Sequence, residues 1–311
     1  MKGPRLSRVL RDVLLAGAPF ALNACMASSC PDNGYEPPIV TSKTVAPDFA
    51  EGGPLSAAQC AEVCDTGESV VTCVRESAES VLCLNQPFPC EGRRPAGLRG
   101  AGQRSRDAFA RHLADAAWLE AASIIAFREL RSELRSNRAP RRLLRALSRS
   151  ARDERRHARA SQALARRFGV PVAPVQSEQP VPRSLLEIAL ENAVEGCVRE
   201  TWGALIALHQ AERATEPAVR ATMSRIAPDE VRHAELAWAV DRWLTLRLAP
   251  IEREQVQAAR AMALSELQRE ARSVPDSDMC LRLGLPGAEE STAMLAAFAE
   301  ALGGRGSLAR H

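Results

Sequence analysis

The sequence has few aromatic residues, almost no lysine and no motif for binding nucleotides. Aromatic residues make up 4% of the 311 positions, and Tyr35 is the single tyrosine. Lysine occurs only at Lys2 and Lys43 among 41 basic residues, a bias typical of GC-rich coding, so arginine clusters are weak evidence of function. The net charge of +3 predicts no strong attraction to nucleic acid. The absence of GxxxxGKS/T, GxSxG and strand-associated GxGxxG motifs excludes the common nucleotide-dependent enzymes and serine hydrolases.

Long hydrophobic runs are also absent, since none reaches the ~18 apolar residues of a membrane-spanning helix. The N-terminus has the features of an export signal instead: basic residues precede a short apolar stretch at 13–21, and Leu22-Asn23-Ala24-Cys25 follows. This pattern resembles a bacterial lipoprotein signal and predicts a signal peptide over 1–24 with lipidation at Cys25. Ordinary secretory cleavage and no export remain alternatives. We therefore expect an exported protein, in the periplasm or at the outer membrane, that contacts membrane only through a lipid anchor.

The cysteines are concentrated near the N-terminus. Nine are present, and six of them fall between residues 30 and 90: Cys30, Cys60, Cys64, Cys73, Cys83 and Cys90. A segment this short builds little core, so we expect three disulfides confined to it, with the pairing open. A zinc site is the rival interpretation, but it is disfavoured because CxxC pairs are lacking. Cys197 is expected to be a buried thiol or the partner of Cys280.

Composition divides the chain into segments and predicts an all-α fold. Apolar residues recur at helical spacing over about 106–136, 140–168, 184–214 and 217–248, with short first and third connections. The connection 169–183 contains four prolines and, when extended, spans about 50 Å. The four ranges and their connection lengths therefore predict a four-helix bundle, with one long crossover between the second helix (140–168) and the third (184–214). The expected segments are a tether (25–53), a small cysteine-rich disulfide module (54–90), a linker (91–106), the bundle (107–248) and a C-terminal helical extension (249–311).

A duplicated motif carries the chemistry. The pattern D-E-x-R-H-A occurs at Asp153–Ala158 and again at Asp229–Ala234. In each copy glutamate and histidine are three residues apart, so Glu154 with His157, and Glu230 with His233, share a helix face that is otherwise apolar. A carboxylate and an imidazole on such a face are costly to bury unless they are paired or bind metal. A solvated, salt-bridging face is the alternative interpretation.

A lone glutamate precedes each copy at a similar distance. Glu120 lies 34 residues before Glu154, and Glu195 lies 35 residues before Glu230, with Glu200 as the alternative on the third helix. Four glutamates and two histidines are the ligands of dinuclear carboxylate sites in helical bundles. Such donors suit two iron ions, with manganese or a mixed Mn/Fe pair as alternatives. A mononuclear site and a bundle that binds no metal remain further alternatives.

The motif also predicts the surroundings of the metal ligands. Asp153 and Asp229 suit positions behind the ligands, where a carboxylate accepts the spare N–H of a histidine on a facing helix. Without metal, we expect the clustered carboxylates to raise one another's pKa. Replacing Glu154 or Glu230 by glutamine would then stabilise the metal-free protein.

Over residues 107–248 these motifs resemble the ferritin-like superfamily, in particular its branch with two ExxH motifs, which includes rubrerythrin and the carboxylate di-iron oxygenases. The segment order, with Gly92–Gly97 before the bundle, is also similar to bacterial ferritin-like lipoproteins. The resemblance implies an oxidase, peroxidase or oxygenase that activates dioxygen or peroxide with a small substrate and an electron donor. A non-catalytic module for metal sequestration or protein interaction is the alternative. The chain lacks the CxxC knuckles of rubrerythrin, and with Tyr35 alone it excludes a tyrosyl radical beside the metals.

Overall fold

The computed structural model describes the helical part of the chain and parts of the N-terminal region. The described residues are 39–45, 70–77, 79–86, 107–177, 180–271 and 277–307, with Leu10, Val13, Leu55, Gln59, Val63, Cys64, Pro95 and Leu98. Most of these residues are helical, in agreement with the predicted all-α class. None of the described helices combines the length and hydrophobicity needed to cross a membrane.

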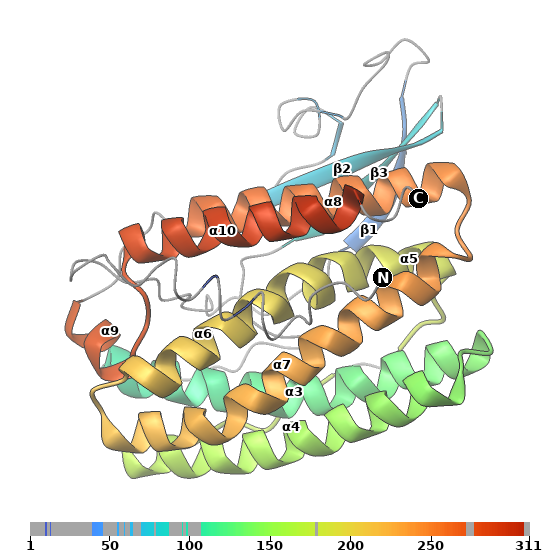
Figure 1. Ribbon diagram of the computed structural model, residues 1–311. Helices are drawn as coiled ribbons and strands as arrows, with labels where there is room; N and C mark the ends of the chain where they lie inside the picture. The colour runs from blue at the N-terminus through green and yellow to red at the C-terminus, as the bar shows by residue number, and fades with distance from the viewer. Residues whose placement is uncertain are drawn as a thin grey trace.

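Long helices are stacked in layers (Figure 1). Helices α3 (Ala108–Ser136) and α4 (Arg141–Arg167) form one antiparallel layer. The next layer contains a continuous helical segment made of α5 (Leu185–Glu191), η1 (Asn192–Arg199) and α6 (Glu200–Arg213), with α7 (Pro217–Thr245) beside it. Helices α8 (Pro250–Glu270) and α10 (Ala288–Ser307) cover the far side, and α9 (Ser277–Leu283) lies between them in the chain. The bounds of α3, α4, the segment α5–η1–α6 and α7 lie within a few residues of the four ranges expected from the sequence, which beyond these ranges predicted only a helical extension where α8 to α10 lie.

Local sequence explains where the helices begin. The Asp107 carboxylate accepts hydrogen bonds from the backbone N–H groups of Phe109 and Ala110, which otherwise lack partners in the first turn of α3. Ser184 and Glu187 form a reciprocal capping box at the start of α5. Helix α7 begins at Pro217, whose missing N–H would be unbonded at this position in any case.

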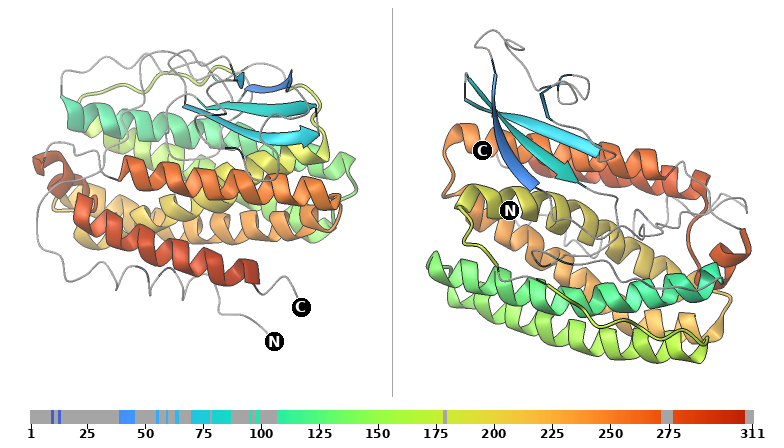
Figure 2. Two further views of the ribbon diagram at one scale, coloured as in Figure 1. Left: turned by 90° about the horizontal axis from the view of Figure 1, so that it is seen from above. Right: turned by 180° about the vertical axis from the view of Figure 1, so that it is seen from behind.

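The long connection between α4 and α5 runs along the outside of the first layer (Figure 2). Its described part packs Val172, Ala173 and Val175 against a small cluster that contains Trp118 of α3. Near its end Arg183 donates two hydrogen bonds to the carboxylate of Glu133, at 2.7 and 2.8 Å. The described part of the connection is therefore held against α3, whereas the sequence predicted only that the connection is long enough to run the length of a bundle.

A small sheet precedes the helices and was not expected. Strands β1 (Ile39–Thr44), β2 (Val70–Ser77) and β3 (Ser80–Gln86) form an antiparallel sheet in the order β1-β3-β2. Strand β1 falls within the segment interpreted as a tether. The sheet lies over α8 (Figure 2), where Met262 packs against a cluster of Leu55, Cys64 and Val81.

Residues of the expected signal peptide also contact the helices. Leu10 and Val13 are buried in the same core cluster as Phe127 and Leu130 of α3. Cys25, the expected lipidation site, lies outside the described residues. Whether the N-terminus is processed as a lipoprotein signal therefore stays a prediction.

The described cysteines depart from the expected arrangement. Cys64 and Cys280 are each disulfide-bonded, and Cys197 is a free, buried thiol. Every other cysteine precedes residue 91, so the partner of Cys280 belongs to the N-terminal region and not to the helices. The disulfides are thus not confined to 30–90. The backbone register places Cys73 opposite Cys83, whereas Cys30, Cys60 and Cys90 lie outside the described residues.

The corner between α9 and α10 is fastened to the turn between α6 and α7. His209 of α6 contacts the Gly284 carbonyl oxygen through Nδ1 at 2.7 Å, and Gln210 donates to the Leu283 carbonyl at 3.1 Å. Gly284 has φ +67°, a left-handed conformation that favours glycine. A Cβ atom at Gly284 would lie 2.6 Å from the Ala214 Cα, so the close approach of two backbones requires glycine here.

Replacing Gly284 by alanine should therefore destabilise the protein strongly. Gly169→Ala is the matched control, since Gly169 has φ +79° but a Cβ atom there would meet nothing within 4 Å. We expect Gly169→Ala to cost about 1 kcal/mol of backbone strain, and Gly284→Ala more than about 3 kcal/mol. Urea unfolding of both variants measures the difference. Equal losses would show that the contact with Ala214 does not constrain this corner.

Candidate metal centre

Carboxylates and imidazoles from three helices meet in the interior. Glu120 of α3, Glu154 and His157 of α4, and Glu230 of α7 each offer one ligand atom, and these atoms lie within 4.8 Å of one another. His233 of α7 adjoins this group. Within the described part of the chain, the structure thus brings together five of the six residues expected to bind metal.

The two motif copies face each other reciprocally. His157 Nδ1 lies 3.0 Å from Glu230 Oε1, and His233 Nδ1 lies 2.9 Å from Glu154 Oε1. Each histidine therefore meets the glutamate of the other copy more closely than that of its own, which is 3.8 Å away for His157 and 3.6 Å for His233. Glu120 Oε2 completes the group at 3.4 Å from His157 Nδ1.

Aspartates lie behind both histidines. Asp229 Oδ2 is 3.1 Å from His157 Nε2, and Asp153 Oδ2 is 3.7 Å from His233 Nε2. Arg156 contacts Asp153 and Asp229 at 2.8 Å each, and Arg232 also pairs with both aspartates. Because these arginine side chains are 58% and 41% exposed, this side of the cluster is the one nearer solvent.

The donor atoms fit a cation. His157 Nδ1, His233 Nδ1 and Glu230 Oε1 are buried, and none of them makes an aligned hydrogen bond with another described residue. Buried polar atoms normally have such hydrogen bonds, whereas here the imidazoles and carboxylates meet only as ion pairs, at 2.9 and 3.0 Å. Oxygen and imidazole donors that converge without hydrogen-bonding are arranged as ligands of a divalent metal ion would be.

In the absence of metal, the histidines take positive charge. Burial by itself lowers the pKa of His157, but contacts with Glu120, Glu154 and Glu230 outweigh it and raise the pKa far above its ordinary value. The pKa of His233 is likewise raised against burial, chiefly by Glu230 and Glu154. The metal-free cluster is thus neutralised by imidazolium groups.

The carboxylates respond unequally, which corrects one expectation. Burial and repulsion from Glu154 raise the pKa of Glu120, as expected. Burial also acts to raise the pKa values of Glu154 and Glu230, but the charge of His233 and contacts with both histidines lower them overall. The expectation of mutually raised carboxylates is therefore wrong for Glu154 and Glu230. Glutamine at either position would remove a stabilising charge from the metal-free protein.

The helix predicted over 184–214 is not a regular α-helix throughout, since it consists of α5, η1 and α6. Segment η1 is a π-helix, in which each turn takes up an extra residue, so α-helical face assignments do not continue across it. Burial acts to lower the pKa of Arg199, but Glu195, within η1, and Glu270 raise it overall, and Glu195 also acts to raise the pKa of Glu266 of α8. Neither Glu195 nor the alternative Glu200 belongs to the group of converging ligands among the described residues, although both are buried.

Comparison with known proteins adds no relative. The chain matches no protein-family model, no curated protein and no solved structure. The helical fold around a glutamate–histidine cluster is compatible with a ferritin-like bundle.

The pKa shifts predict how the stability of the metal-free protein depends on pH. The raised pKa values of the histidines stabilise the folded protein fully below about pH 6.5, the pKa of histidine in the unfolded chain. This stabilisation is lost as the pH rises towards the pKa values of the histidines in the folded protein. The lowered pKa values of Glu154 and Glu230 stabilise the folded protein fully above about pH 4.5, the pKa of glutamate in the unfolded chain. This stabilisation is lost as the pH falls towards the pKa values of these glutamates in the folded protein. The raised pKa of Glu120 acts in the same direction as those of the histidines, so the free energy of unfolding should fall as pH rises above about 6.5.

Urea unfolding of chelator-treated protein at pH 6 and pH 9 measures this dependence. We expect stability to fall towards pH 9, and the fall to shrink in the variant His157→Gln/His233→Gln. Arg145→Gln, an exposed change on α4, should keep the wild-type dependence. A wild-type protein that is more stable at pH 9 would contradict the raised histidine pKa values.

Proposed function

We propose that the chain is an exported ferritin-like protein that holds two metal ions, most simply iron, and activates dioxygen or peroxide in the cell envelope. The observation that carries this proposal is the reciprocal approach of His157 to Glu230 and of His233 to Glu154. Two copies of a motif that face each other across helices α4 and α7 offer matching donors to two neighbouring ions. The duplicated sequence and its spacing support the same arrangement.

The protein residues would have distinct roles. Glu120, Glu154 and Glu230 would supply anionic oxygen ligands, while His157 and His233 would bind through Nδ1 after losing their protons. Asp229 and Asp153 would keep the Nε2 protons in place and so fix which nitrogen faces the metal. A further ligand would come from the segment α5–η1–α6, as Glu195 of η1 or Glu200 of α6. Bound iron would supply the reducing electrons and a Lewis acid for an O–O bond.

The surroundings of the cluster suit oxidative chemistry. The side chains of His157 and His233 are 3% and 1% exposed, so the two imidazoles are shielded from bulk water. Phe127 packs against His233 with ring centroids 5.2 Å apart, which places an apolar wall beside one donor. A dry, apolar wall limits side reactions of an activated oxygen species.

A non-catalytic metal-binding module is the second candidate function. The converging group of described residues contains Glu120, Glu154, His157 and Glu230, which is sufficient for one ion. No glutamate of the third helix belongs to that described group. Sequestration of metal at the cell surface requires binding alone.

Metal content tests the site independently of catalysis. We expect about two ions per chain after anaerobic loading with ferrous iron or manganese. Glu230→Gln should lose most of this metal, whereas Glu235→Gln, an exposed change five residues further along α7, should retain it. Glu195→Gln and Glu200→Gln are measured in parallel. The variant with reduced metal content identifies which of these two glutamates, in η1 or in α6, is a ligand. Wild-type metal in His157→Ala/His233→Ala would exclude the proposed site.

Turnover separates the two candidate functions. If the iron-loaded protein is an oxidase or peroxidase, it should consume many equivalents of dioxygen or peroxide when a chemical reductant is supplied. An oxygen electrode and a peroxide assay measure this consumption. Glu235→Gln should match wild type, and Glu230→Gln should approach the rate without protein. A single stoichiometric oxidation followed by no further consumption would favour sequestration.

A further inference from the structure

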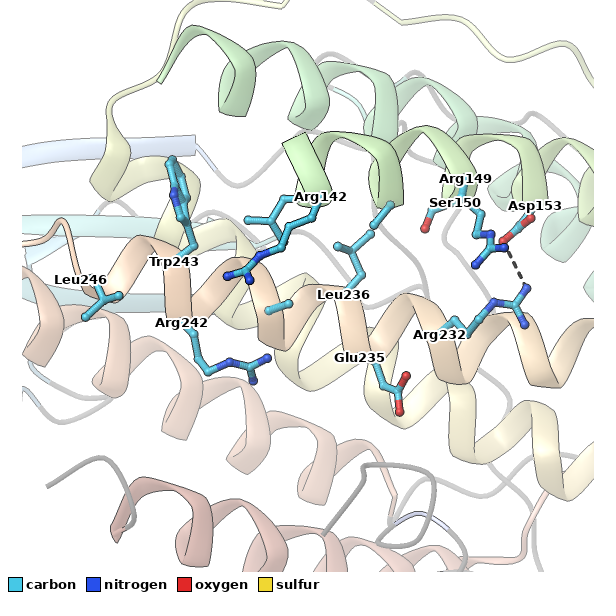
Figure 3. Close-up of a pocket in the computed structure, with 13 residues that line it drawn as sticks. Arg142, Arg149, Ser150, Asp153, Arg232, Glu235, Leu236, Arg242, Trp243 and Leu246 are labelled. Carbon is cyan, nitrogen blue, oxygen red and sulfur yellow. Dashed lines mark hydrogen bonds and ion pairs between the residues drawn. The ribbon is translucent and has the colours of Figure 1, made fainter. Parts of the chain in front are cut away.

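A groove on the outer face of the helices contains an unusual combination of side chains. It lies between α4 and α7, beside Asp153, and has a volume of about 690 Å³ (Figure 3). That size is within the range of sites for small organic molecules. Residues of opposite character line it: arginines from both helices, and apolar side chains that include Leu143, Leu236 and Trp243.

The apolar side chains are placed to contact a hydrophobic body. Leu143 and Leu236 are buried, and Ala146 and Ala239 lie beside them in the lining. Trp243 stands near one end of the groove, where Leu246 is 84% exposed (Figure 3). An exposed leucine that extends a buried apolar lining gives a ligand apolar surface to cover.

The charged side chains make the groove basic. Four arginines line it, namely Arg142 and Arg149 from α4 and Arg232 and Arg242 from α7, against the carboxylates Asp153 and Glu235. Asp153 is already engaged by Arg156 and Arg232. Arg142 and Arg149 are exposed, and neither forms an ion pair with any described residue.

The position of these arginines is informative although arginine is common in this chain. Arg145 and Arg152 are also exposed on α4, but they do not line the groove. Only the arginines at one edge of the helix are set against the apolar lining. Arginine there can donate two parallel hydrogen bonds to a carboxylate or phosphate.

We propose that the groove between α4 and α7 binds an elongated organic anion, with a carboxylate or phosphate head held by Arg142 and Arg149 and an apolar body on Leu236 and Trp243. Neither arginine belongs to the carboxylate–histidine cluster. Binding of this anion therefore does not require that the cluster hold metal, and failure of either proposal leaves the other intact.

Titration calorimetry with octyl phosphate, below its micelle concentration, tests this site in the full-length protein. We expect saturable binding of one molecule that is weakened at least about tenfold by Arg142→Ala/Arg149→Ala. The matched control Arg145→Ala/Arg152→Ala removes the same charge from the same helix and should change the affinity less than about twofold. Arg232 is left unchanged because it also pairs with Asp229 near the histidines.

Further ligands separate the contributions of head and body. Inorganic phosphate should bind at least about tenfold more weakly than octyl phosphate if the apolar lining contributes. Octanol and octyltrimethylammonium should bind more weakly still, because they offer no anion to the arginines. Decanoate should bind at the same place and compete with octyl phosphate.

Several outcomes would overturn the proposal. Equal binding of octyltrimethylammonium and octyl phosphate would show that charge plays no part. Equal losses in the two double variants would show a general electrostatic effect and no built site. Binding to vesicles of anionic phospholipid without binding of the monomeric ligands would assign the arginines to a membrane surface instead.

Discussion

Burial of charge in the interior is the constraint on which the helical layers depend. Carboxylates at Glu154 and Glu230 lie among apolar helix faces, where an unpaired charge would be very costly. The fold offsets this cost by setting each glutamate against the histidine of the opposite motif copy, at 2.9 and 3.0 Å. Helices α4 and α7 must therefore pack in the register that brings both pairs together. Since α3 adds Glu120 and packs as a hairpin with α4, the positions of three helices are coupled through one cluster.

The C-terminal extension supplies carboxylates to a second buried charge, the guanidinium group of Arg199 in η1. Arg199 is 3% exposed and contacts Glu266 and Glu270 of α8 at 3.5 and 3.2 Å. Burial raises the pKa of Glu266 to about 7, although Arg199 acts against this. Without α8, this arginine would have no carboxylate from that layer. Helix α8 therefore contributes to the same core cluster as η1.

Sequence alone predicted the features that repeat with a regular spacing. The duplicated motif located Glu154, His157, Glu230 and His233, and the apolar periodicity located the helices, because both signals rest on the α-helical repeat. Where that repeat is broken, spacing no longer identifies which residues share a helix face. The π-helix at Asn192–Arg199 shifts the faces of the third helix, so spacing could not choose between Glu195 and Glu200. The pairing of β1 with β3 and the disulfide of Cys280 join segments that are distant in the chain, for which the sequence has no local signal, whereas β2 and β3 form a local hairpin that helical spacing does not address.

Asp153 and Asp229 lie on the outer side of the cluster and contact its histidines and arginines. Burial acts to raise the pKa of Asp153, but contacts with His233 and Arg156 hold it well below its usual range, so the carboxylate stays ionised. Arg156 links Asp153 to Asp229, and each aspartate faces the Nε2 atom of a histidine from the other motif copy. The hydrogen bond with Asp229 orients the imidazole of His157 through Nε2, and both imidazoles direct Nδ1 towards the glutamates. Protons on Nδ1 can then occupy the positions that metal ions would take, because both neutralise the same carboxylates.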